Sequence, residues 1–297
     1  MKKLLLSAAF MLAVGTTSAQ VVFSENFDTF ADLAPAGWIS TNQSVPIGAG
    51  AWAQGGGTAF PGGSYNGTEF SFALVNYTSA TGNGTISNWL ITPVMTLENG
   101  DIISFYTRKG GTGTGTIYPD RLELRISTNG AASVTPSGGA TNVGDFTTLA
   151  VSVNPNLNPT DYPFTWTQYT YTVTGLTGPT DSKLAFRYFV TNGGTTGSNS
   201  DIIAIDALSV DRPLSTADFF RNNFAMYPNP AKDVLNISAN TMELSGATIT
   251  DINGRVVKQQ AVSGMTAQIN VSELNAGVYF VSVESAEGKG TAKFVKN

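Results

Sequence analysis

Short runs that alternate apolar and polar residues recur from residue 21 to residue 210, and they limit the fold more than any other feature. Arg121 to Ile126 and Leu184 to Val190 each place apolar side chains at every second position, the period of a β-strand. Glycine-rich stretches such as Gly48 to Gly67 separate these runs and cannot continue them. No long helical periodicity is present. The pattern predicts an all-β fold with two packed sheets.

The sequence contains neither Cys nor His, and both absences exclude kinds of site. Without His, a Ser-His-Asp triad, an imidazole general base and a His-ligated zinc site are all excluded. Without Cys, an exported chain has no disulfides and must be held by burial, β-ladders or a bound ion. Any catalysis would therefore rest on carboxylates, Lys, Tyr or an oxygen-ligated metal.

The formal charge of -5 comes from sixteen Lys and Arg that are scattered along the chain and twenty-one Asp and Glu. Binding to nucleic acid needs a concentrated basic face, which this distribution does not supply. The charge therefore argues against nucleic acid and favours basic partners or neutral sugars.

The N-terminal residues 1–19 have the layout of a secretory signal peptide. Two lysines precede an apolar run from Leu4 to Val14, and small residues at Thr17 to Ala19 precede an expected cleavage before Gln20. A buried N-terminal helix is the alternative. The run is too short to span a bilayer, and no other segment reaches that length. We expect an exported chain with no transmembrane segment.

The last segment, residues 226–297, carries three motifs in order: a Tyr-Pro-Asn-Pro opening, an Asp-x-x-Gly hairpin and a Leu-x-x-Gly-x-Tyr strand. The motif residues are Tyr227, Pro228, Asn229, Pro230, Gly254 and Gly277. Together they resemble the type A sorting domain of the type IX secretion system. Physically, the prolines fix an extended entry, Asn229 can brace the turn, and the two glycines supply backbone freedom.

This resemblance implies a small immunoglobulin-like β-sandwich that addresses the protein and does no chemistry. The outer-membrane type IX secretion machinery would read the folded module. A sortase-like transpeptidase would then remove it by a cut in the linker, residues 213–225, and could attach the remainder to surface lipopolysaccharide. The protein is thus expected to be secreted or displayed on the exterior of the outer membrane.

Residues 20–212, the expected first domain, contain further short motifs in a fixed order. They are Phe23 to Phe27, Gly37-Trp38, Asn88 to Pro93, Leu122 to Gly130, Trp166 to Tyr169, Leu184 to Tyr188 and Ile205 to Val210. This order resembles the cleaved-adhesin domain, also called choice-of-anchor J, a jelly roll found in the adhesin regions of gingipain-type proteases. Asn88 stands where the family often has Asp, and Ala207 stands where it commonly has Asn or Asp, so any role of those side chains is not carried over.

Glu25 and Asp206 alternate in phase with apolar neighbours, so regular strands would turn both carboxylates to an apolar face. The first and last strands of a jelly roll commonly lie side by side, and the two carboxylates could share a cation. Ca²⁺ suits such ligands, with Asp28 or backbone carbonyls completing the shell, and a structural ion would replace the missing disulfides. Alternatively, a β-bulge turns either side chain outward, or each accepts backbone N–H bonds at a turn.

Aromatic residues in the loops are candidates for ligand binding, because flat rings can stack on sugar faces. The candidates are Trp52, Tyr65 and Tyr118, with Tyr162 as a fourth. The alternative is that these rings roof the ends of the sandwich.

A carboxylate-dependent hydrolase of polysaccharide is the enzymatic alternative, since paired carboxylates are the minimum for that reaction. Asp120 and Glu123 are near in sequence, but on one strand they face opposite sides, which favours a solvated strand edge. We therefore expect a non-enzymatic, adhesin-like protein that binds a glycan or an extracellular protein. An inert structural component of the surface layer is the third possibility.

Overall fold

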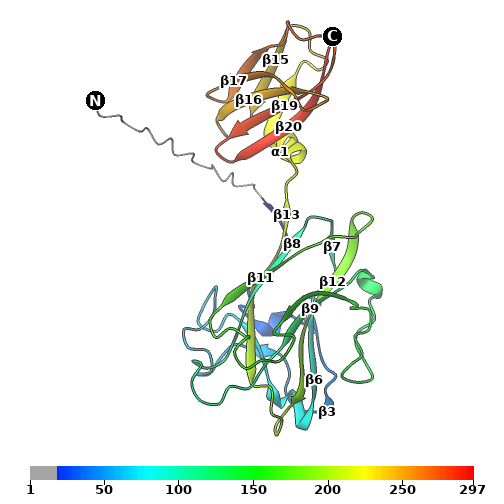
Figure 1. The fold of residues 1–297 in the computed structure, drawn as a ribbon, viewed down its shortest axis with the longest axis vertical. Coiled ribbons are helices and arrows are strands. Elements are labelled where there is room, and N and C mark those ends of the chain that lie inside the picture. The colour runs from blue at the N-terminus through cyan, green and yellow to red at the C-terminus, as the bar shows by residue number, and fades with distance from the viewer. Residues whose placement is uncertain (1–18) are drawn as a thin grey trace, which may run out of the picture. The chain divides into compact units, whose positions relative to one another are not determined.

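The computed structural model describes residues 19–297, which divide into two compact units, residues 21–212 and residues 213–297 (Figure 1). The signal peptide expected at residues 1–19 lies outside the described residues, apart from Ala19. Among residues 19–297, no helix has the length and apolar character that crossing a membrane requires.

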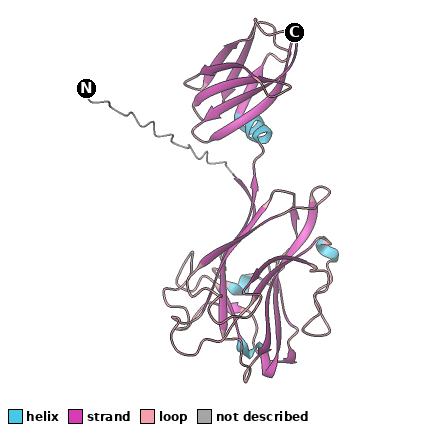
Figure 2. Ribbon diagram, viewed as in Figure 1, coloured by secondary structure: helices cyan, strands magenta, loops and turns pink. Residues whose placement is uncertain are grey.

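The first unit is a sandwich of two antiparallel sheets (Figure 2). In the first sheet the order is β11 (Thr167–Thr172), β8 (Ile102–Lys109), β13 (Ile202–Pro213), β5 (Ala73–Asn76) and β4 (Ala53–Gln54), and β1 (Ala19–Glu25) also pairs with β13. In the second the order is β10 (Thr148–Val153), β9 (Leu122–Ser127), β12 (Thr180–Gly193), β6 (Ala80–Ile91) and β2 (Ile39–Asn42), while β3 (Val45–Ile47) pairs with β6 and β7 (Met95–Leu97) with β12. Three short 3-10 turns interrupt the loops: η1 (Phe30–Asp32), η2 (Tyr77–Ser79) and η3 (Gly130–Ala132). The jelly-roll sandwich expected from the sequence is confirmed.

The core of this unit lies between the two sheets, as the strand alternation requires. Phe105 of β8 and Phe186 of β12 meet edge to face, with ring centroids 5.0 Å apart. Leu122, Leu124 and Leu184 are fully buried beside them. Each such side chain contributes about 1.5–3 kcal/mol by leaving water, so burial holds a domain that has no disulfides.

Both outer faces of the sandwich are partly covered by loops, which the sequence pattern did not predict. Residues 55–72 pack Phe60 and Phe72 on the first sheet, and Phe146 packs on Trp89 of the second. Glu123 is buried on the outer face of the second sheet, near the loop that contains Phe146. Its Oε2 lies 3.0 Å from Arg187 Nη1 and 2.7 Å from Arg125 Nε. The expectation of a solvated edge at Asp120 and Glu123 is therefore wrong, because loop residues and arginines cover what local alternation alone would expose.

The second unit is a smaller sandwich of three and four strands. One sheet has the order β14 (Phe224–Tyr227), β15 (Val234–Ala239), β18 (Thr266–Asn270). The other has the order β17 (Val256–Ala261), β16 (Leu244–Asp251), β19 (Gly277–Ser285), β20 (Gly288–Lys296). Seven strands in two sheets match the immunoglobulin-like architecture expected for this segment.

Most of the expected linker, residues 213–225, is folded. Ser215 caps helix α1 (Thr216–Asn223), its Oγ accepting the Asp218 N–H at 3.1 Å. Phe219, Phe220 and Phe224 are buried in the core of the second unit. The segment that the sequence predicts as a linker therefore contributes a helix and three buried phenylalanines to the second unit.

Candidate functional site

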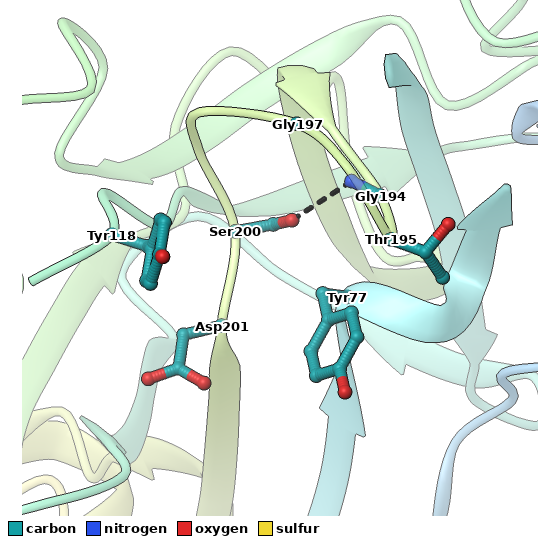
Figure 3. Close-up of a pocket in the computed structure, with 7 residues that line it drawn as sticks. All are labelled: Tyr77, Tyr118, Gly194, Thr195, Gly197, Ser200 and Asp201. Atoms are coloured by element: carbon teal, nitrogen blue, oxygen red, sulfur yellow. Dashed lines mark hydrogen bonds between the residues drawn. The ribbon is translucent and has the colours of Figure 1, made fainter. Parts of the chain in front are cut away.

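A cleft of about 300 Å³ opens at one end of the first unit, between the segment before β9, the turn η2 and the loop between β12 and β13. Its lining residues are Tyr77, Tyr118, Gly194, Thr195, Gly197, Ser200 and Asp201. Tyr77 and Tyr118 are each 40% exposed. In Figure 3 the Asp201 carboxylate lies on the Tyr118 side of the cleft, and the Tyr77 ring lies on the other side of the segment that carries Asp201. Aromatic faces, a carboxylate and hydroxyls converge here, the mixture that small-ligand sites use.

Tyr77 is held against Asp201 by the backbone. The Tyr77 N–H donates to the Asp201 carbonyl over 2.7 Å, which ties η2 to the start of β13. Asn76 caps the same turn, because its Oδ1 accepts the Thr78 N–H at 2.9 Å. The ring of Tyr77 therefore projects from a fixed turn and not from a loose loop.

A buried ion pair supports the other wall of the cleft. Lys109 Nζ donates to Asp120 Oδ2 at 2.9 Å and to the Tyr118 carbonyl at 2.5 Å. Asp120 Oδ1 accepts the Asp201 N–H at 2.8 Å and the Tyr188 hydroxyl at 2.6 Å. One pair thus positions the backbone of both Tyr118 and Asp201.

The loop between β12 and β13 needs glycine at two positions. A Cβ on Gly194 would lie 2.6 Å from the Gly82 carbonyl oxygen, and one on Gly197 would lie 2.3 Å from the Asn192 carbonyl oxygen. Ser200 adopts φ +76°, a left-handed conformation that side chains rarely take, and its Oγ accepts the Gly194 N–H at 3.0 Å. Close backbone packing therefore shapes this wall, at the cost of strain at Ser200.

Asp201 is the acidic side chain in the lining of the cleft. Partial burial raises its pKa, the nearby Asp120 charge raises it further, and Lys109 opposes both effects. Within residues 19–297 the carboxylate accepts no hydrogen bond and forms no ion pair, because Lys109 is committed to Asp120. A half-buried carboxylate without a counter-ion is poised to accept one from a ligand.

The four aromatic residues that the sequence offers as ligand-binding candidates lie in different surroundings in the structure. Tyr118 lines the cleft. Trp52 is only 3% exposed and donates its indole N–H to the Asn88 carbonyl, so the expectation that it stacks on a ligand is wrong. Tyr162 is fully buried against Thr107. Both large side chains fill the sandwich, which sequence alternation in a loop cannot reveal.

Tyr65 lies on the outer face of the first sheet and does not line the cleft. It is 48% exposed and stacks on Tyr106, with ring centroids 3.5 Å apart and hydroxyl oxygens 2.8 Å apart. This hydrogen bond is the largest cause of a raised pKa of Tyr106. The stacked pair is a second exposed aromatic surface, in which the Tyr65 and Tyr106 rings already contact each other.

Asp206 is fully buried, and a β-bulge decides where it points. Ala207 takes φ +47° and the register shifts after Asp206, so Leu208 and Val210 face the core while Asp206 lies under residues 65 and 66. Its Oδ2 accepts the N–H groups of Tyr65 at 2.8 Å and Asn66 at 2.9 Å. The expectation that Asp206 shares a face with Leu208 is wrong, because the bulge shifts the alternation by one residue.

The other two calcium candidates lie in the segment at the end of β1, beside β13. Glu25 is half-buried, and its Oε1 accepts the Phe27 N–H at 2.7 Å. Asp28 is exposed and close enough to raise the pKa of Asp206 further, although burial is the main cause. Their hard oxygen ligands suit Ca²⁺ in kind. In residues 19–297, however, no group of three or more acidic side chains is placed to hold a metal ion.

In the second unit the opening motif is joined to the last strand. Asn229 Oδ1 accepts the Val295 N–H at 3.0 Å, so this side chain braces a contact across the module. Tyr227 is exposed and ends β14, both Tyr227-Pro228 and Asn229-Pro230 are cis peptide bonds, and the chain bends at residues 229 and 230. The expectation that the two prolines fix an extended entry is therefore wrong. Gly254 takes φ +80° in the hairpin, as expected. Gly277 does not need such freedom, since it opens β19 and a Cβ there would meet only Tyr279 at 3.8 Å.

Sequence reasoning missed Tyr77, Thr195, Ser200 and Asp201 as members of one site. They come from segments more than a hundred residues apart, and only sheet pairing brings those segments together. The available signal was local: a glycine-rich stretch, residues 193–200, ends in an acid at the start of a strand.

Residues 225–297 match the family model of the secretion system C-terminal sorting domain. Among solved structures, the chain is similar to the K1 cleaved adhesin domain of Lys-gingipain from Porphyromonas gingivalis, with 18% identity, 64% of this chain and 97% of that chain covered, and a TM-score of 0.40. The K2 cleaved adhesin domain of Lys-gingipain is 17% identical, with 63% of this chain and 98% of that chain covered and a TM-score of 0.40. A carbohydrate-binding module of the β-sandwich superfamily is 12% identical, with 66% of this chain and 63% of that chain covered and a TM-score of 0.35.

No curated protein matches the sequence. The match to the sorting domain agrees with the Tyr227 to Pro230 opening, the Gly254 hairpin and the seven-stranded sandwich. The C-terminal unit of this protein is a type IX secretion sorting domain, which directs the chain to secretion or to the cell surface.

Proposed function

We propose that the first unit is a non-enzymatic, adhesin-like module that binds a glycan or an extracellular protein in the cleft around Tyr77, Tyr118 and Asp201. The observation that carries this proposal is that two tyrosines, each 40% exposed, line one cleft together with a carboxylate that forms no ion pair or hydrogen bond within residues 19–297. Large exposed aromatics on a fixed backbone offer contact area at low entropic cost, which is typical of binding surfaces.

The cleft supports binding better than hydrolysis. Glycoside hydrolysis uses two carboxylates about 5–10 Å apart across the bond that breaks. The lining of this cleft contains one, Asp201. Asp120 lies nearby, but it is buried and bonded to Lys109 and Tyr188.

A screen of the full-length protein against glycans and matrix proteins tests the binding proposal. The Tyr77→Ala/Tyr118→Ala double variant should lose at least about tenfold in affinity for any ligand found, at about 1 kcal/mol or more for each lost ring. Tyr65→Ala is the matched control, because it removes an exposed tyrosine outside the cleft. Binding that depends on Tyr65 and not on the cleft tyrosines would contradict the proposed site.

We propose further that a sortase-like transpeptidase removes the sorting unit and joins the first unit to surface lipopolysaccharide. The support is the match of residues 225–297 to the sorting-domain family, together with the motif residues from Tyr227 to Gly277 in the sequence. A truncation after Arg212 tests the sorting step, since a cut at Phe224 would leave Phe219 and Phe220 without their core. The truncated protein should remain in the periplasm, and normal surface display would contradict the assignment.

A further inference from the structure

We infer that the cleft takes an organic cation, the ammonium or guanidinium group of a Lys or Arg side chain on a basic partner protein. This inference rests on the proposed function and names the chemistry of its ligand. Three independent features of residues 21–212 lead to it.

The first feature is the missing counter-charge at Asp201. Asp201 is half-buried, and the cation whose charge acts on its carboxylate, Lys109, is bound to Asp120. A positively charged ligand would act as the counter-ion that the Asp201 carboxylate lacks. A neutral sugar can donate hydroxyl hydrogen bonds to this carboxylate, but only a cation also compensates its charge.

The second feature is the aromatic pair. Tyr77 and Tyr118 line the same cleft as the carboxylate, and each residue is 40% exposed. A cation near the face of an aromatic ring is attracted by the electrons of the ring, by about 0.5–2 kcal/mol as water is excluded. Two rings and an acid also match the shape of a Lys or Arg side chain, whose stem is apolar and whose head is charged.

The third feature is the surface charge of the whole unit. Residues 21–212 contain fourteen Asp and Glu against seven Lys and Arg, a formal charge of -7. None of the seven basic side chains is exposed: three are buried and four are half-buried. The exposed charges are all acidic, at Asp28, Asp32, Glu69, Asp161 and Asp181.

This distribution decides between sources of the cation. The basic residues are used inside, as with Arg187 on Glu123 and Arg212 on Asp101, so the outer field is negative. Such a field attracts a partner whose positive charges extend beyond the cleft, and it speeds the encounter. A basic protein surface fits this better than a single small amine. A polymer of amino sugars is the competing source that the experiment separates.

The experiment titrates the full-length protein by calorimetry with hexalysine and with the same peptide acetylated on every Nε atom. Hexaglucosamine and its N-acetylated form are the second pair of probes. Hexalysine should bind, and its acetylated form should bind at least about tenfold more weakly, the loss expected for a charge-assisted bond. The affinity for hexalysine should also fall as salt rises from about 50 to about 500 mM, because ions screen the outer field.

Asp201→Asn and Glu69→Gln form the matched pair of variants. Each removes one negative charge, but only Asp201 lines the cleft, and the substitution there keeps the backbone N–H that Asp120 accepts. Asp201→Asn should weaken hexalysine binding at least about tenfold, and Glu69→Gln less than about twofold. Equal weakening by both variants would overturn the inference, since it would mean attraction to net charge alone.

The remaining outcomes are separable. Binding of hexaglucosamine but not hexalysine, with dependence on Asp201, would overturn the protein partner in favour of an amino-sugar polymer. Binding of a neutral glycan that needs Tyr77 and Tyr118 but tolerates Asp201→Asn would overturn the inference and keep the proposed function. Ligands whose affinity is unchanged by substitution of Tyr77, Tyr118 and Asp201 would overturn both the inference and the proposed function.

Discussion

Lys109 Nζ lies 2.9 Å from Asp120 Oδ2, and this buried pair joins the two walls of the cleft. The same ammonium holds the Tyr118 carbonyl, and the same carboxylate holds the Asp201 N–H. Asp120 also raises the pKa of the Tyr188 hydroxyl well above its usual range, after burial as the main cause. We therefore expect the stability of the first unit, and the shape of its cleft, to depend on this one polar cluster.

Replacing Lys109 with Met should lower the unfolding free energy of the first unit by about 3–5 kcal/mol, because it leaves the Asp120 charge buried without a partner. Urea unfolding measures the loss. Lys183→Met is the control, since Lys183 is half-buried and forms no ion pair within residues 19–297, and it should change stability by under about 0.5 kcal/mol. Similar losses in both variants would contradict a special role for the pair.

Asp206 should make stability depend on pH. Burial raises the pKa of this carboxyl from 3.8 to about 6. Between these values the folded protein keeps a proton that the unfolded chain releases. The contribution of Asp206 is thus full below about pH 4 and is lost as pH rises through 6, a change of up to about 3 kcal/mol.

The measurement compares the wild type with Asp206→Asn in chelator from pH 4 to pH 7. Other carboxylates titrate in both proteins, so the difference between the two unfolding free energies isolates Asp206. The unfolding free energy of the wild type should fall relative to that of Asp206→Asn as pH rises. A difference that stays flat over this range would show that the carboxyl keeps its ordinary pKa.

Glu25, Asp28 and Asp206 are not grouped as a preformed metal site in residues 19–297. We nevertheless propose, as the sequence leads us to expect, that Ca²⁺ stabilises the first unit near these three side chains, which would have to rearrange to bind it. The support is electrostatic, because the Asp28 charge repels that of the buried Asp206 and a cation would relieve this repulsion. Backbone carbonyls or waters would have to complete the shell. The melting temperature should rise with Ca²⁺ and fall with chelator, and Asp28→Asn should blunt the response. An unchanged midpoint after verified metal removal would exclude the site.

The two motif glycines of the sorting unit should differ under the same substitution. Gly254→Ala should destabilise this unit by about 1–2 kcal/mol, because residue 254 takes φ +80°. Gly277→Ala serves as its control and should change stability by under about 1 kcal/mol, since a Cβ fits there and strand residues other than glycine are favoured. Urea unfolding of the full chain measures both. Equal losses would mean that Gly277 is also conformationally required.

Part of the site could be predicted from the sequence because its signals are local. Tyr118 was a candidate as a large aromatic beside glycine-rich loops, and it lines the cleft. Trp52 had the same kind of signal and is buried, since the space between the sheets, and not the neighbouring residues, decides which rings are covered. Asp206 shows a second limit: one residue in a left-handed conformation, Ala207, reverses the faces of the residues that follow.

The sequence by itself determined the all-β class, the sandwich and the sorting domain, because strand alternation and turn motifs act over a few residues. The address of the protein follows from the Tyr227 to Pro230 opening and the Gly254 hairpin without any knowledge of packing. Only the tertiary structure decided what meets at the cleft. Tyr77, Tyr118 and Asp201 approach one another through pairings between distant strands, and the burial of Lys109 with Asp120 leaves Asp201 as the free charge. Non-local contacts and desolvation control that outcome, and neither is visible in a linear pattern.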